Sequence, residues 1–80
     1  MAAMGMATPD ELQRLRDADG VDAERLFLEL MIKHHKGALD MAQLAADHAT
    51  QDEVRRLAAA IIEAQTAETR LMQDYLEARS

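Results

Sequence analysis

The chain has 80 residues, which is enough for a single domain. It contains no cysteine, so it can form neither a disulfide nor a thiolate zinc site. A formal net charge of -6 and an aromatic content of 2% argue against nucleic-acid binding, which needs a basic face and stacking side chains. Hydrophobic residues make up 49% of the chain, too many for a disordered acidic tail, yet no apolar run approaches the ~20 residues that span a membrane.

Three helices are predicted along the chain, over residues of about 9–18, 22–48 and 51–78. The first begins at a capping box, in which Thr8 caps the helix, Pro9 takes the first position and Glu11 reaches back to Thr8. Asp19-Gly20 is a stop signal that ends this helix, and Asp22 is the expected cap of the second one.

The third helix is expected to begin at a second capping box, which runs from Thr50 to Glu53. No segment alternates polar and apolar residues with a period of two, so no strand is predicted.

The two long helices each carry a wide apolar face. On the second helix, a ladder with a spacing of seven residues lies opposite the polar face and consists of Phe27, His34, Met41 and His48. The third helix repeats the pattern with Val54, Ile61, Glu68 and Tyr75. The first helix is too small to cover both faces, so each needs a further neighbour. We therefore predict an all-α fold, a short N-terminal helix plus a long antiparallel hairpin, that pairs with a second chain into a homodimeric four-helix bundle.

Polar residues interrupt these apolar ladders at one level of the predicted hairpin. If the chain turns near residue 50, His34 and His35 lie level with Gln65 and Glu68. Imidazole suits copper, zinc, iron and nickel, and thioether sulfur selects copper(I). Bundle cores are a usual place for such ligands. The predicted metal donors are His34, His35, Glu68, Gln65, Met31, Met41 and Met72.

A structural interpretation of the same residues stays open from spacing alone. A buried His–Glu or His–Gln hydrogen bond between these residues can fix the register of a bundle, and methionines at helical spacing commonly fill core gaps. His35 can line a second packing face. His48 lies in the last turn of its helix, where a cation interacts favourably with the dipole.

The sequence gives little support to other chemistry. The only serine is Ser80, at the chain end, and no glycine-rich phosphate loop is present, so we expect no enzymatic activity. Met4 and Met6, near the start of the chain, are expected to be incidental.

Two stretches of the chain resemble a known family. Residues 27–42 read F-L-E-L-M-I-K-H-H-K-G-A-L-D-M-A, which is similar to the signature F-x-x-x-M-I-x-H-H-x-G-A-x-x-M-A of the family called domain of unknown function 305. Residues 53–76 fit the second part of that pattern, E-V-R-x-L-A-x-x-I-I-x-A-Q-x-x-E-x-x-x-M-x-x-x-L.

The resemblance implies a ferritin-like helical fold in which one module pairs with another, because longer members of the family carry two modules in tandem. It also implies copper binding or copper tolerance, with the seven donor positions matched. We therefore predict a small metal-binding bundle protein that buffers copper or a similar soft transition metal. The alternative is a non-catalytic dimerisation or interaction module with a structural buried His/Gln/Glu layer. A ferritin-like oxidase needs more carboxylates than one Glu per hairpin supplies.

The compartment is left open by the sequence. The resemblance suggests an exported protein, in the periplasm or at the cell surface. Residues Met1 to Met6, however, lack the basic start and the long apolar stretch of a signal peptide, so we expect no such signal within this chain.

Overall fold

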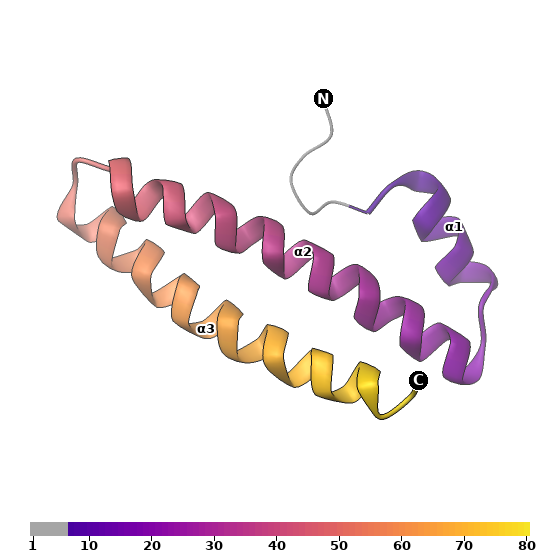
Figure 1. Cartoon of the computed structure of the whole chain (residues 1–80). Helices are drawn as coiled ribbons and strands as arrows, with labels where there is room; N and C mark the ends of the chain where they lie inside the picture. Colours follow the sequence, from indigo (N-terminus) through magenta and orange to yellow (C-terminus); the bar gives the residue numbers. More distant parts are fainter. Residues whose placement is uncertain (1–6) are drawn as a thin grey trace.

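The structure, a computed structural model, describes residues 7–80. The chain forms three helices, α1 (Pro9–Asp17), α2 (Gly20–His48) and α3 (Asp52–Glu77), and the described residues contain no strand (Figure 1). The all-helical class and the hairpin of two long helices are confirmed. Met4 and Met6 lie outside the described residues.

The first helix begins at the predicted capping box. The backbone N–H of Glu11 donates to Thr8 Oγ1 over 3.1 Å, and the backbone N–H of Thr8 donates to Glu11 Oε1 over 2.9 Å. Two of the amide donors at the start of the helix, which have no partner within the helix, are satisfied in this way.

The other two predicted caps are wrong. The N-cap of α2 is Asp19 rather than Asp22, and the N-cap of α3 is Gln51 rather than Thr50; neither makes a side-chain capping bond. Helix α2 starts earlier than expected because Gly20 adopts a φ of +57°, a left-handed conformation that glycine tolerates without steric cost. The same glycine therefore makes the turn after α1 and opens α2.

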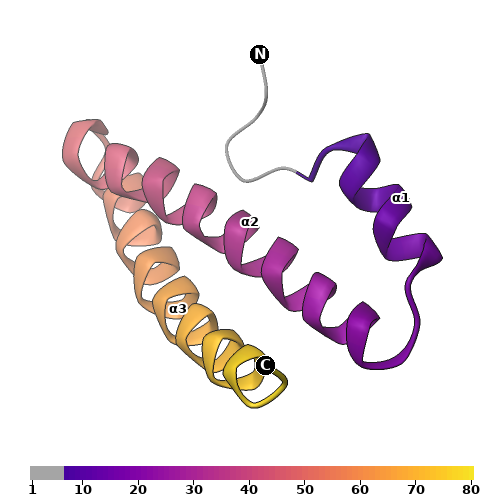
Figure 2. The same ribbon diagram turned by 45° about the vertical axis from the view of Figure 1, so that its right-hand side comes forward.

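Helices α2 and α3 run antiparallel, side by side, along their whole length (Figures 1 and 2). The buried residues Leu28, Ile32, His35 and Ala42 follow one another on one side of α2 at helical spacing. His35 bonds Glu68 of α3 and Ala42 lines a groove with Ala58, so this stripe faces α3. Ala58 and Thr69 are the buried residues of α3. The buried contact is thus made of small and medium-sized side chains at coiled-coil spacing.

The seven-residue ladders do not lie between α2 and α3. Phe27 is 49% exposed, Met41 is 55% exposed and His34 is also exposed. The stripe that α2 uses against α3 is displaced from the ladder by one residue, which is a rotation of about 100° around the helix. The ladders therefore lie outside the contact between α2 and α3.

The three helices form a single layer. Helix α1 packs against α2 and not against α3 within the described chain, and it lies on the far side of α2 from α3 (Figures 1 and 2). The principal extents are 45 × 30 × 13 Å, so the thin dimension is about one helix diameter. The radius of gyration of 14.8 Å exceeds the roughly 12 Å of a compact domain of this length.

A layer one helix thick cannot bury much. No large side chain among the described residues is fully buried, and nine large hydrophobic residues are more than two-fifths exposed. No helix in the described part of the chain is long and apolar enough to cross a membrane. The layer therefore has two open faces, and one of them is apolar.

Candidate functional site: the His35–Glu68 pair and the apolar face

His35 is the buried polar residue at the centre of the hairpin, with 6% of its surface exposed. Its Nδ1 lies 2.9 Å from the carbonyl oxygen of Met31, one turn earlier in α2. A carbonyl oxygen can only accept, so Nδ1 carries a proton and donates it. The ring is thereby locked with Nε2 directed at α3, where it lies 2.6 Å from Glu68 Oε2.

The partner carboxylate lies at the edge of the layer. The side chain of Glu68 is 60% exposed, whereas that of His35 is only 8% exposed. One proton must lie between Nε2 and Oε2, because an unprotonated imidazole nitrogen and a carboxylate oxygen are both acceptors. The pair joins two helices across 33 residues of sequence, so it pins the register of α2 against α3.

Two further oxygens of α3 lie near this pair with no hydrogen-bond partner among the described residues. They are Gln65 Oε1 and Thr69 Oγ1, and both are buried. Buried polar atoms are nearly always hydrogen-bonded, so these two oxygens leave acceptor capacity unused beside Glu68.

The structure corrects the prediction of which histidine meets Glu68. His35 makes that contact, whereas His34 is exposed. The two rings are perpendicular, with centroids 6.1 Å apart. The level along the hairpin was predicted correctly, but the neighbouring residue takes the position because α2 turns a different stripe toward α3.

The predicted methionine donors are spread over the molecule. Met31 offers its carbonyl oxygen to His35 while its side chain lines a groove between α1 and α2. Met41 is exposed in a second groove, between α2 and α3, that Gln65 also lines. Met72 is half-buried on α3. In the described part of the chain, no three His, Asp or Glu side chains lie close enough together to hold a metal ion.

Helical spacing places both grooves on one face of the layer, because Phe27 and His34 line one groove, Met41 lines the other, and the three follow one another at intervals of seven residues on α2. The groove between α2 and α3 has a volume of about 380 Å³ and is lined mainly by Ala38, Met41, Ala45, Val54, Leu57 and Ile61. The groove between α1 and α2 has a volume of about 320 Å³ and is lined by Ala7, Leu12, Leu15, Phe27, Leu30, Met31 and His34.

The apolar face continues along α3 beyond the grooves. Leu71 and Tyr75 are 49% and 48% exposed and follow Leu57 and Ile61 at helical spacing. Glu68 lies on this side of α3 as well, at helical spacing from Ile61, Leu71 and Tyr75. We define the apolar face by its large side chains, which are Phe27, Met41, Val54, Leu57, Ile61, Leu71 and Tyr75.

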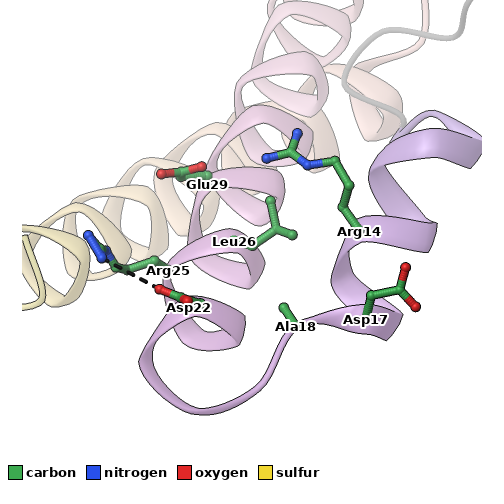
Figure 3. Close-up of a pocket in the computed structure, with 7 residues that line it drawn as sticks. All are labelled: Arg14, Asp17, Ala18, Asp22, Arg25, Leu26 and Glu29. Atoms are coloured by element: carbon green, nitrogen blue, oxygen red, sulfur yellow. Dashed lines mark ion pairs between the residues drawn. The ribbon is translucent and has the colours of Figure 1, made fainter.

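A charged cleft lies at the other end of the α1–α2 contact. Charged side chains surround Leu26 there: Arg14, Asp17, Asp22, Arg25 and Glu29 (Figure 3). Arg14 extends from α1 toward α2, and Arg25 forms an ion pair with Asp22 over 3.8 Å. Both signs of charge are mixed in this open cleft, so it shows no preference for an ion of either sign.

An ion pair across 22 residues of sequence helps to hold α1 in place. Lys33 Nζ donates to Glu11 Oε1 over 2.9 Å. The backbone N–H of Thr8, and then the Lys33 ammonium, lower the pKa of Glu11 from its ordinary value of 4.5 to about 2.

Comparison with known proteins agrees with this architecture. The model of the family described as Domain of unknown function (DUF305) matches residues 1–76. The chain belongs to this family. No curated protein matches it.

A solved structure of the same family is similar over nearly the whole chain. It is a DUF305 protein of Streptomyces coelicolor that is described, by inference, as secreted, and it shares 40% sequence identity and a TM-score of 0.90 with this chain. The match covers 96% of this chain and 48% of that one. The present chain thus spans about half the length of that DUF305 protein.

Proposed function

We propose that this DUF305 chain is a helical pairing module, whose apolar face packs against the same face of a second copy to complete a four-helix bundle. One observation carries the proposal: the layer is 13 Å thick, and its apolar side chains have no second layer to pack against. Stable domains bury such faces between at least two layers of secondary structure.

The size of the apolar face supports this assignment. Six of its side chains are 42–61% exposed, which leaves on the order of 600 Å² of apolar surface. This is at the upper limit for the largest patch on a soluble monomer. It also approaches the ~800 Å² that each partner contributes to a stable interface.

A matched pair of substitutions on α3 tests the pairing. Ala64 and Ala59 are both exposed, but helical spacing places Ala64 on the apolar face, between Ile61 and Leu71, and Ala59 on the polar side. Sedimentation equilibrium should show a dimer for the wild type and for Ala59→Glu, and a monomer for Ala64→Glu. A wild-type chain that remains monomeric at a concentration of about 100 micromolar, where a dimer with a dissociation constant in the micromolar range would form, contradicts the proposal.

Metal binding is a second candidate function, favoured by the orientation of His35. A ligating histidine typically donates its other ring N–H to a carbonyl or carboxylate, and His35 Nδ1 donates to the Met31 carbonyl in this way. Its Nε2 then faces the Glu68 carboxylate, and Gln65 offers an unpartnered oxygen. These residues fit a bound transition metal in part, because one chain supplies only two strong donors and a closed site needs three or four.

Copper is the ion that we propose for the site at His35, Glu68 and Gln65. Met31, Met41 and Met72 lie on the same two helices, and thioether sulfur favours copper(I). The chain would then buffer copper or a similar soft transition metal, in keeping with the family resemblance. Since the similar DUF305 protein is described as secreted, we further propose that this chain acts outside the cytoplasm.

Titration of the apo-protein with copper(I), copper(II) and zinc tests the metal proposal. Binding should raise the free energy of unfolding by about 2.7 kcal/mol at a hundredfold excess over the dissociation constant, and His35→Phe should remove this gain. His48→Phe is the matched control, because His48 is exposed at the end of α2. Equal gains in the two variants contradict a site at His35.

A further inference from the structure

The apolar face carries two polar side chains at a single level. His34 is exposed, and neither of its two ring nitrogens forms a hydrogen bond with any residue that the structure describes. Glu68 gives one carboxylate oxygen to His35, and its other oxygen makes no hydrogen bond within residues 7–80. Because His35 is bonded to Glu68, its neighbour His34 lies at the level of Glu68 as well.

This level is the middle of the hairpin. Helix α2 runs from Gly20 to His48, so His34 has the same length of helix on either side. When two copies pack face to face with full overlap, the two-fold axis passes through the middle of both hairpins or runs along them. In both arrangements, the His34–Glu68 level of one copy meets the same level of the other.

Pairing would remove these polar groups from water. A buried donor or acceptor without a partner is strongly unfavourable, so the bound partner must supply one acceptor and one donor at this level. A second copy does so reciprocally when the two-fold axis runs along the hairpins, because this axis places α2 of one copy over α3 of the other. The imidazole N–H of each copy then meets the free carboxylate oxygen of the other. The similar DUF305 protein is about twice as long as this chain, which leaves room for a comparable second half.

We propose that, in the paired form, His34 of each copy donates a hydrogen bond to Glu68 of the other copy, and that these two contacts set the register of the interface. The inference rests on the pairing proposed above and names the residues that make it specific. The apolar side chains supply the contact area, and the polar pair selects one alignment among those that the apolar surface alone would accept.

Mixing two singly substituted chains tests this inference. A heterodimer of His34→Leu with Glu68→Leu keeps one His34–Glu68 contact and places the two leucines opposite each other. Each homodimer instead carries two mismatched contacts. The His35–Glu68 bond within a chain is lost twice in the Glu68→Leu homodimer, once in the heterodimer and not at all in the His34→Leu homodimer. This loss therefore cancels in the ratio of heterodimer squared to the product of the two homodimers.

Native mass spectrometry of the mixture, with one chain isotopically labelled, measures the populations. We expect the ratio of heterodimer squared to the product of the homodimers to exceed the statistical value by roughly tenfold or more. A statistical mixture overturns the inference but leaves the pairing proposal standing. A wild-type chain that never dimerises overturns both.

A second measurement avoids any change at Glu68. His34→Leu should weaken the wild-type dimer by roughly tenfold, although leucine adds apolar surface, and His34→Gln should recover affinity because its amide still donates. His48→Leu is the matched control, since it makes the same change on the same ladder but away from the middle of α2. A dissociation constant for His34→Leu that equals that of His48→Leu overturns the inference.

Discussion

Replacing Glu68 with leucine should destabilise the metal-free chain more than replacing His35 with leucine, although both changes remove the same hydrogen bond. The asymmetry follows from burial. The His35 side chain is 8% exposed and the Glu68 side chain is 60% exposed, so only one of the two partners is stranded away from water when the other is lost.

The magnitude can be worked out from the two environments. Glu68→Leu leaves His35 Nε2 buried without a partner, which costs about 1–3 kcal/mol. His35→Leu leaves a carboxylate that can turn to solvent, and it fills the buried position with an apolar side chain of similar size, for which costs below ~1.5 kcal/mol are usual. In the double variant nothing is stranded, so most of the loss from Glu68→Leu should be recovered.

Urea unfolding of the three variants in the presence of a chelator measures these differences. The series should be made in the Ala64→Glu background, so that pairing does not contribute to the measured stability. In a domain of this size, each kcal/mol corresponds to roughly 4–8 °C in melting temperature. Equal losses in the two single variants, or a double variant as unstable as Glu68→Leu, would refute the account of the His35–Glu68 pair.

Two further predictions concern α1 and the turn that follows it. The pKa of Glu11 is lowered to about 2 from 4.5, first by the backbone N–H of Thr8 and then by Lys33. The stability that ionised Glu11 gives to the start of α1 and to its contact with α2 is therefore present above pH ~4.5 and is lost as the pH falls toward 2. Protection factors of the α1 amides, from hydrogen exchange corrected for its intrinsic pH dependence, should fall over this range, and they should change less in Glu11→Gln. Gly20→Ala should lower the free energy of unfolding by about 1 kcal/mol through the positive φ of residue 20 alone, because a Cβ there would have no heavy atom within 4 Å. Thermal unfolding should show Gly20→Asn to be the milder change. A wild-type melting temperature for Gly20→Ala would exclude backbone strain.

The three helices and the antiparallel hairpin of α2 and α3 could be predicted because the sequence signals for them are local. The capping box of Thr8 and Glu11 and the apolar periodicity of the two long helices both act within a few residues. The level at which a histidine meets Glu68 also follows, since a turn near residue 50 fixes the position of every residue in an antiparallel hairpin.

The choice between His34 and His35 could not be predicted because α2 is apolar around more than half of its circumference. Two stripes one residue apart could each face α3, and the one with larger side chains, which includes Phe27 and Met41, was the natural choice from sequence. In the structure the smaller side chains pack between α2 and α3. The larger ones remain on the apolar face, where a second layer can bury more area against them.

In these proposals metal binding depends on pairing, because one chain supplies too few donors, whereas pairing does not depend on a metal. The proposed pairing rests on the apolar face of a single layer and invokes no ion. A metal at this layer, by contrast, finds only His35 and Glu68 as strong donors in one chain, while a closed site needs three or four. In our proposal a second copy completes the site. Ala64→Glu, which should abolish pairing, should then also abolish the stabilisation by copper although it leaves both donors in place. Copper-induced stabilisation of the monomeric Ala64→Glu chain equal to that of the wild type would separate the two properties and place the metal elsewhere in the molecule.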